Sequence, residues 1–318
     1  MSLAHRLVSV RRSLLTALIC AALPGTFAYA QSCSAPWPGV HPVFTSRIEY
    51  GDRGRKSDPY IAVRINGKLA KMLLDTGSNA HVIWDARLLG EGGDNATHET
   101  QTLDAIASST QAKGALLTLD DATGNEHLQR FYVIAETPLM ADGFSGIISP
   151  QSLAQEKVSV LNFKDDCFFV SDRFDPEAGG RYRTEAVGAI PNSDRVMGIP
   201  LDVPGGRVPV VVDSGAYRTT LLGSLMHSAP VGRDRTTNVD LLGNVIVGKR
   251  RTRLVDITIN GRHAPRHPVV PASAISEKGI VSLGAVGMDL LAGNVIFHDG
   301  DRNRFAFVET AGRVEVSQ

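Results

Sequence analysis

The order of apolar and polar residues along the chain predicts short β-strands joined by tight turns. Residues 60–65 alternate in polarity, Asn66-Gly67 is a two-residue hairpin signal, and the apolar run Leu69–Leu74 follows it. Strand patterns of this kind return as far as a last hairpin around His298–Asp301. Among them are two separate strands, Val245–Val247 and Leu254–Ile259, the second closed by the turn Asn260-Gly261. The 31 glycines and 16 prolines supply residues for many such turns. We therefore predict an all-β fold.

Two of the predicted strands run directly into an aspartate that is followed by a hydroxyl residue and a glycine. The first run is Lys71-Met72-Leu73-Leu74-Asp75-Thr76-Gly77-Ser78, and the second is Val210-Val211-Val212-Asp213-Ser214-Gly215-Ala216. An acid at the end of a buried strand is poorly placed for a solvated surface charge. A glycine two residues later lets the backbone turn tightly and lets another chain approach closely. The two matching sites predict two carboxylates that face each other.

Each aspartate belongs to a longer internal repeat. The landmarks are, in order, Gly67, Asp75, Gly146 and Phe163 in the first half and Gly205, Asp213, Gly287 and Phe297 in the second. In both halves the first glycine precedes the acid by eight residues. The second glycine follows the acid by 71 and 74 residues, and the phenylalanine follows it by 88 and 84. This spacing predicts an internal duplication with one acid in each half.

The first thirty residues are predicted to be a signal peptide. Three arginines precede a short apolar run, and Ala28-Tyr29-Ala30 forms a small-x-small cleavage site before Gln31. The run is too short for a permanent anchor, so we expect a periplasmic or secreted protein without a stable membrane span. The pair Arg11-Arg12 leaves both general and twin-arginine export open.

The mature chain is predicted to have two parts of similar size. Residues 31–175 form the first part with Asp75, residues 176–192 form a linker, and residues 193–318 form the second part with Asp213. The linker is predicted from Pro176, Gly179, Gly180 and several charges.

Composition narrows the classes of partner. Without the leader, 30 basic residues stand against 33 acidic ones, which argues against nucleic acid or an anionic membrane as the main partner. Cys33 and Cys167 either pair in an oxidising compartment or remain independent thiols. The nine histidines are scattered singly and no Cys/His set has zinc spacing, so we predict no metal site and no cofactor.

Two carboxylates close together at a dry interface hold one proton between them, because both cannot easily ionise. That arrangement suits hydrolysis of an amide: the ionised acid takes a proton from water, and the protonated acid supports the carbonyl oxygen. Gly77 and Gly215 would let the loops meet and direct backbone N–H groups at the acids. The hydroxyls of Thr76 and Ser214 would bond across to the opposite loop.

Asp75-Thr76-Gly77-Ser78 and Asp213-Ser214-Gly215, each followed by an apolar-apolar-glycine element, resemble the aspartic peptidases of the pepsin and retropepsin type. The resemblance extends from about Tyr60 to Val308. It implies two homologous β-rich lobes of the pepsin-like fold with a central cleft. It also implies that Asp75 and Asp213 are the catalytic pair, supported by Thr76, Gly77, Ser78, Ser214 and Gly215. The substrate would be a protein or peptide, one chain would supply both lobes as a monomer, and the hairpin Thr100–Leu116 would be the flap.

The chain departs from that family at three places. Ala216 replaces a hydroxyl residue that is usual in pepsin-like second lobes, the candidate flap lacks a tyrosine, and Ser214 replaces threonine. The missing hydroxyl at Ala216 suggests a higher pKa for the pair of acids and activity nearer neutral pH.

Other interpretations of the two acids remain open. A peptide-binding protein without turnover would keep the same cleft, and the unusual flap and Ala216 are its support. Another hydrolase with paired carboxylates, such as a glycosidase, gains little support from 6% aromatic residues. Each aspartate could also simply cap a turn, as is common in Asp-x-Gly sequences.

Overall fold

The computed structural model describes residues 33, 35, 37, 39–90, 96–104, 108–180, 182–187, 196–273, 275–277 and 280–310. The predicted signal peptide lies outside these residues, as do Ile106 and Ala107 of the predicted flap hairpin. Strands make up 55% of the structure and helices 9%, so the predicted all-β class is confirmed.

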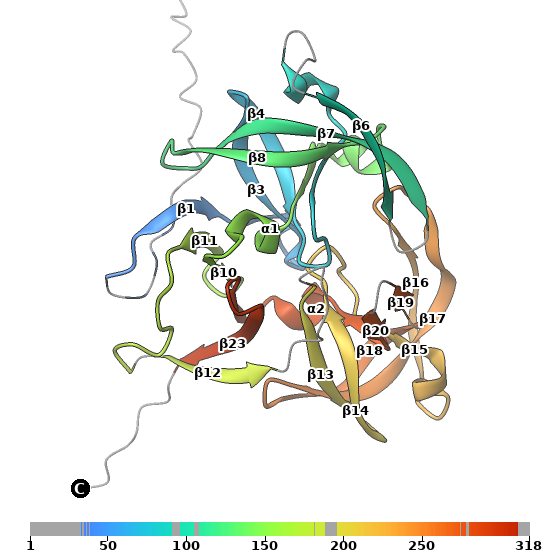
Figure 1. The fold of residues 1–318 in the computed structure, drawn as a ribbon. Coiled ribbons are helices and arrows are strands. Elements are labelled where there is room, and N and C mark those ends of the chain that lie inside the picture. The colour runs from blue at the N-terminus through green and yellow to red at the C-terminus, as the bar shows by residue number, and fades with distance from the viewer. Residues whose placement is uncertain are drawn as a thin grey trace, which may run out of the picture.

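The first half of the chain forms an eight-stranded sheet (Figure 1). From edge to edge, its strands are β2 (Glu49–Asp52), β3 (Ser57–Ile65), β4 (Lys68–Leu74), β9 (Gly146–Ile148), β5 (His81–Ile83), β8 (Glu126–Val133), β7 (Ser109–Asp120) and β6 (Ala96–Asp104). The pairs β4–β9 and β5–β8 are parallel, and the other pairs are antiparallel.

The second half forms a seven-stranded sheet with the same order of strands. From edge to edge, they are β13 (Gly198–Val203), β14 (Gly206–Val212), β21 (Gly284–Val286), β15 (Thr220–Leu222), β18 (Arg262–Ala272), β17 (Val245–Ile259) and β16 (Val231–Val239). The parallel pairs β14–β21 and β15–β18 occupy the places of β4–β9 and β5–β8. The additional pairing β3–β7 also has its counterpart, β13–β17. The repeat found in the sequence is therefore matched by a repeat of sheet order.

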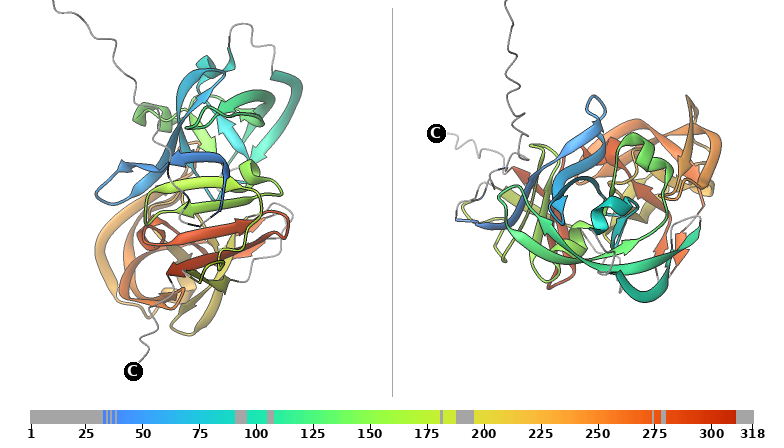
Figure 2. Two further views of the ribbon diagram at one scale, coloured as in Figure 1. Left: turned by 90° about the vertical axis from the view of Figure 1, so that its left-hand side faces the viewer. Right: turned by 90° about the horizontal axis from the view of Figure 1, so that it is seen from above.

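A six-stranded sheet joins the two halves. Its order is β1 (Pro42–Arg47), β11 (Cys167–Ser171), β10 (Val158–Asn162), β22 (Val295–Asp299), β23 (Arg304–Thr310) and β12 (Tyr182–Val187). The central pair, β10 and β22, comes from equivalent places in the two halves. In the left view of Figure 2 this sheet lies between the strands of the first half above and those of the second half below.

The remaining elements are short. They are the α-helices α1 (Pro150–Ala154) and α2 (Met288–Leu291), the 3-10 helices η1 (Ala86–Leu89), η2 (Pro138–Asp142) and η3 (Gly223–Met226), and the two-stranded pair β19 (Ile275–Glu277) and β20 (Ile280–Ser282). In the described part of the chain, no helix is both long and apolar enough to cross a bilayer.

The hairpin turns form where the sequence predicts them. Asn66 and Gly67, between β3 and β4, have positive φ angles of 49° and 75°. Asn260 and Gly261, between β17 and β18, have φ angles of 51° and 69°. Two successive residues in this region match the twist of the flanking strands, and Asn-Gly is the pair that adopts it most readily.

Two segments differ from their predicted form. Residues 245–247 and 254–259 were expected to be separate strands but are parts of one strand, β17. The charged run Lys249-Arg250-Arg251 between them conceals this continuity, because Arg250 and Arg251 are exposed and give no apolar alternation. The predicted linker at 176–192 contains β12, which pairs with β23 along its whole length.

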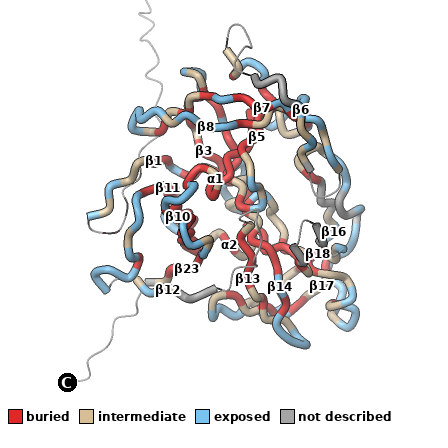
Figure 3. The backbone as a smooth tube through the Cα atoms, in the orientation of Figure 1, coloured by how far each residue is buried: buried red, intermediate tan, exposed pale blue. Residues whose placement is uncertain are grey.

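The apolar core extends through both halves and ends at the two aspartate loops. Buried residues, red in Figure 3, concentrate in the strands at the centre of the molecule. Met72 and Leu74 of β4 and Val210 and Val212 of β14 are fully buried in one common cluster. At the ends nearest the aspartate loops both strands are buried on both faces, since Leu73 and Val211 are buried as well.

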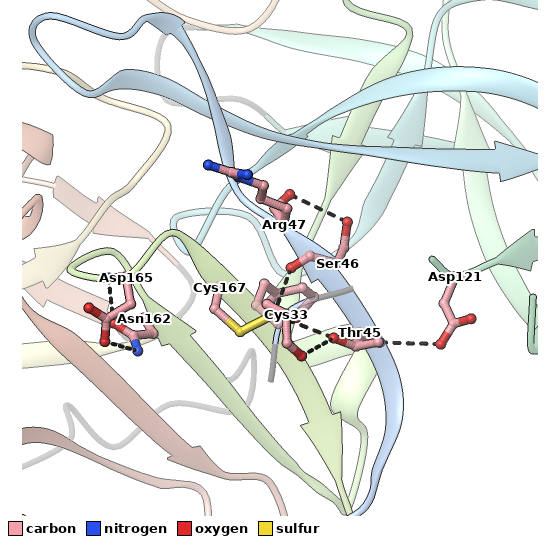
Figure 4. Close-up of a disulfide and its surroundings, with 9 residues drawn as sticks. Cys33, Thr45, Ser46, Arg47, Asp121, Asn162, Asp165 and Cys167 are labelled. Carbon is pink, nitrogen blue, oxygen red and sulfur yellow. Dashed lines mark hydrogen bonds between the residues drawn. A yellow bond between two sulfur atoms is a disulfide. The ribbon is translucent and has the colours of Figure 1, made fainter. Parts of the chain in front are cut away.

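Cys33 and Cys167 form a disulfide, which settles the alternative left open by the sequence. The bond ties the N-terminal segment to β11 beside β1 (Figure 4). Thr45 of β1 donates its hydroxyl to the carbonyl oxygen of Cys33 at 3.2 Å and its N–H to Asp121 at 3.2 Å. These contacts anchor the segment on the six-stranded sheet.

Candidate active site

The two predicted acids lie on equivalent loops, at the ends of β4 and β14. The N–H of Asp75 donates to the carbonyl oxygen of Ile148 at 3.1 Å, and the N–H of Asp213 donates to that of Val286 at 3.0 Å. Both bonds continue the parallel pairing of the aspartate strand with β9 or β21. The structural counterpart of Gly146, the first residue of β9, is Gly284, the first residue of β21, and not Gly287 as the spacing of the repeat predicted. The repeated sheets therefore place each acid by the same backbone contacts.

The loops meet so closely that each glycine lies against the opposite acid. A methyl group on Gly215 would lie 2.8 Å from the Cγ atom of Asp75. A methyl group on Gly77 would lie 2.9 Å from the Oδ1 atom of Asp213. Real Cβ atoms do not approach a carboxyl group this closely, so a larger residue at either position would displace the opposite acid. The structure thus brings Asp75 and Asp213 together, each half supplying one carboxyl.

Hydroxyl groups join the two loops behind the acids. The hydroxyl of Thr76 donates to Val212 O at 2.8 Å and accepts the N–H of Ser214 at 3.0 Å. The hydroxyl of Ser214 donates to Leu74 O at 2.6 Å and accepts the N–H of Thr76 at 3.0 Å. The cross-loop hydrogen bonds predicted for these two residues are confirmed. Both side chains are fully buried, so the bonds form away from competing water.

The acids themselves lie on the accessible side of this contact. Gly77 and Gly215 are exposed and the two aspartates are half-buried, whereas Thr76 and Ser214 are not accessible. The loops therefore present the carboxyl groups outwards and keep their connecting hydroxyls inside.

The surroundings of the two carboxyl groups differ, although the groups hydrogen-bond to each other. Burial raises the pKa of Asp75, and the N–H groups of Gly77 and Ser78 act in the opposite direction. Burial, followed by the negative charge of Asp75, raises the pKa of Asp213 to about 7. Asp75 raises the pKa of Asp213, whereas Asp213 lowers that of Asp75, so these mutual effects favour Asp213 as the holder of the shared proton.

Ser78 and Ala216 occupy the position after the glycine in the two loops, and only Ser78 carries a hydroxyl group. Ser78 donates its hydroxyl to Ala80 O at 2.8 Å, a local contact in its own loop. The N–H of Ala216 donates to Asp213 Oδ1 at 3.1 Å, and the N–H of Gly77 donates to Asp75 Oδ1 at 2.8 Å. Burial and the negative charge of Asp75 raise the pKa of Asp213, and the proposed effect of the missing hydroxyl at Ala216 stays a prediction.

Two buried polar residues that we did not predict hold the loops from behind. Gln151 of α1 donates its side-chain amide to Thr76 O at 2.7 Å. Asp289 of α2 accepts the N–H of Thr219 at 3.0 Å and its hydroxyl at 2.6 Å, and His267 lies 3.1 Å from the same carboxylate. Gln151 follows Gly146 by five residues and Asp289 follows Gly284 by five, so only a repeat aligned on these two glycines would have pointed to both.

The predicted flap segment is a hairpin of β6 and β7, and its described end reaches the other half of the molecule. Ser108 donates its hydroxyl to Asp240 Oδ2 at 2.6 Å and accepts the side-chain amide of Asn244 at 3.0 Å. Asp240 and Asn244 belong to the turn between β16 and β17, the hairpin at the equivalent place in the second sheet. Figure 1 shows the two hairpins approaching each other on the right.

The described residues contain no group of three or more histidine, cysteine, aspartate or glutamate side chains arranged to hold a metal ion. A cavity of about 410 Å³ lies elsewhere, between β1, β8 and α1. Among its charged lining residues, Lys157 pairs with Asp172, and Arg173 pairs with Asp301. None of the predicted site residues lines it.

The sequence matches no protein-family model and no curated protein at a significant level. The interpretation of the paired aspartates therefore rests on their geometry.

Proposed function

We propose that this chain is an aspartic endopeptidase that hydrolyses peptide bonds with water activated between Asp75 and Asp213. The reciprocal placement of the two acids carries the proposal: each carboxyl lies against the glycine of the opposite loop, and hydroxyl groups fix the separation of the loops. A turn-capping role would need neither contact between the loops nor a glycine at both positions.

The unequal acids give each a part in the reaction. Asp75, ionised, takes a proton from a water molecule whose oxygen attacks the carbonyl carbon of the peptide. Asp213, protonated, transfers its proton to the carbonyl oxygen, which gives a neutral tetrahedral diol. Asp75 then donates the proton it gained to the amide nitrogen, one hydroxyl of the diol returns a proton to Asp213, and the C–N bond breaks. The pair regains its single proton, and one water molecule has been consumed.

The repeated sheets support the finer proposal of two pepsin-like lobes, with the substrate lying over the acids. In this arrangement the β6–β7 hairpin covers the extended peptide as a flap. One chain supplies both acids, so the enzyme would act as a monomer.

We also propose that the protein is exported and acts in the periplasm or outside the cell. The disulfide between Cys33 and Cys167 supports this, because such bonds persist in oxidising compartments. Removal of residues 1–30 would leave Cys33 in the mature chain.

The proposed function is tested by digestion of a mixed peptide library with residues 31–318 across about pH 3 to 8, with and without a statine-type inhibitor. We expect cleavage that the inhibitor blocks and that declines as the pH rises past the pKa of Asp213. Cleavage that the inhibitor leaves unchanged would contradict the proposal. Tight binding of the inhibitor without any turnover would instead favour a peptide-binding protein.

A further inference from the structure

Positive charge is concentrated in one part of a chain that is otherwise acidic. Residues 231–266 contain eight lysines and arginines against three aspartates, although the mature chain has 30 basic and 33 acidic residues. These residues form β16, β17 and the start of β18, at one edge of the second sheet.

The strands place two of the arginines directly opposite each other. Arg235 of β16 pairs with Arg251 of β17, and both side chains are exposed. Like charges at opposite positions of an antiparallel pair destabilise it. In the described part of the chain neither arginine forms an ion pair. Arg233, two residues before Arg235 on β16, and Arg250, next to Arg251 on β17, are also exposed. This surface therefore lacks the negative charge that would offset its repulsion.

Protection of the sheet edge explains only part of the cluster. Among the described residues, β16 is the last strand of its sheet, and a charge on such a strand discourages pairing with other molecules. That purpose is served by Arg233 and Arg235 alone. It gives no reason for Arg251, which lies on the inner strand opposite Arg235 and adds repulsion.

The arginine-rich surface of β16 and β17 is connected to the loop that carries Asp213. Arg218, five residues after this acid, forms ion pairs with Asp234 of β16 at 3.3 Å and with Asp289 at 3.9 Å. The ion pair with Asp234 therefore links β16 to the loop that carries Asp213.

We propose that the edge of β16 binds an acidic, extended segment of a polypeptide, with its carboxylates against Arg235 and Arg251. The free backbone groups of an edge strand can pair with an added strand, and alternate side chains of that strand reach one face of the sheet. Identification of the segment as part of a substrate rests on the proposed function, whereas the binding itself does not. The enzyme would thus select substrates that carry an acidic stretch away from the cleaved bond.

The surroundings of the β16–β17 hairpin favour a polypeptide over a membrane surface as the binding partner. Its apolar tip residues, Leu241 and Leu242, pack against the first half of the molecule, and Asp240 binds Ser108. The tip is therefore not free to enter a lipid layer, as membrane-binding elements with apolar ends do.

The test uses residues 31–318 with Asp75→Asn, so that cleavage does not consume the probe. The probe is a fluorescein-labelled peptide of about ten residues with alternating glutamate and threonine, compared with a matched peptide that has glutamine for glutamate. We expect the double variant Arg235→Glu/Arg251→Glu to weaken binding of the acidic peptide at least about tenfold. The control Lys164→Glu, an exposed residue in the turn after β10, should change it less than about twofold. Equal binding of both peptides, or equal loss in both variants, would overturn the proposal.

Two further experiments separate the alternatives. Binding to anionic phosphatidylglycerol vesicles but not to the acidic peptide would overturn the proposal in favour of a membrane contact. A cleavable peptide with and without the acidic segment is then given to the enzyme that has both aspartates. A lower KM for the extended peptide would support the substrate role. If the acidic peptide binds but neither cleavable peptide is cleaved, the proposed binding surface stands and only the proposed function is contradicted. If both cleavable peptides are cleaved with the same KM and the acidic peptide does not bind, only the proposed binding surface is contradicted.

Discussion

Thr76 and Ser214 exchange hydrogen bonds across the contact between the two halves: each donates its backbone N–H to the hydroxyl of the other at 3.0 Å. Each hydroxyl also donates to a carbonyl oxygen just before the opposite aspartate. Neither residue touches water, so the two loops are held at one separation by bonds that solvent does not weaken. The position of the paired acids depends on this exchange.

The first prediction concerns the hydroxyl of Thr76. Thr76→Val keeps the shape of the side chain but leaves the N–H of Ser214 and the carbonyl oxygen of Val212 buried without a partner. We expect it to lower the free energy of unfolding by about 2–4 kcal/mol, measured by chemical denaturation. Thr76→Ser keeps the hydroxyl and should lose only about 1 kcal/mol. Equal losses in the two variants would show that the hydroxyl does not hold the loops together.

The second prediction concerns the close approach of Gly215 to Asp75. Gly215→Ala would place a methyl group 2.8 Å from the carboxyl carbon, so the acid must move. We expect kcat/KM for a cleaved peptide to fall at least about 100-fold. The matched control is Gly223→Ala, where the nearest atom would lie at 3.8 Å, and activity should not change. An active Gly215→Ala enzyme would show that the carboxyl does not need its observed place.

The third prediction follows from the raised pKa of Asp213. Its usual value is 3.8 and burial beside Asp75 raises it to about 7, so the folded protein binds more protons than the unfolded chain between these values. Stability must then fall as the pH rises through this range. Asp213→Asn removes the effect, so its stability relative to the natural protein should rise by about 2–4 kcal/mol from pH 4 to pH 7.5.

The control for this titration is Asp142→Asn, since Asp142 is an exposed residue of η2. Its stability should differ from that of the natural protein by the same amount at both pH values. If Asp213→Asn and the natural protein differ in stability by the same amount at pH 4 and at pH 7.5, the shared proton is not held by Asp213.

The fourth prediction concerns the disulfide, which closes a loop of 134 residues. Replacement of both Cys33 and Cys167 by serine should lower the free energy of unfolding by about 3 kcal/mol, because the unfolded chain gains freedom. A reductant should lower the stability of the natural protein by a similar amount and leave the double variant unchanged. If the reductant has no effect on the natural protein, the bond does not contribute to its stability.

The sequence predicts those parts of the site whose residues lie close together in the chain. The strand, acid, hydroxyl and glycine of each loop lie within about eight positions, and the all-β class follows from alternation and turn residues. Gln151 and Asp289 could not be assigned in this way, because their partners Thr76 and Thr219 lie 75 and 70 residues away. Their side chains resemble ordinary helix-start residues until the fold brings them behind the loops.

The remaining differences have a similar origin. β17 was expected as two strands because the charged run Lys249-Arg250-Arg251 in its middle contains no apolar residue that would show alternation. The pairing of Cys33 with Cys167 stayed open because sequence separation does not give a distance. The order of strands in the two repeated sheets is a property of long-range pairing, and the sequence indicated only that the two halves correspond.

The central claim is that Asp75 and Asp213 act as one pair that shares a proton. The most direct measurement compares kcat/KM of the natural protein, Asp75→Asn and Asp213→Asn on one peptide that the natural protein cleaves. We predict that each single replacement lowers kcat/KM by at least about 1,000-fold and that the double replacement lowers it little further, because both acids serve the same step. Retention of most of the activity in either single variant would contradict the account.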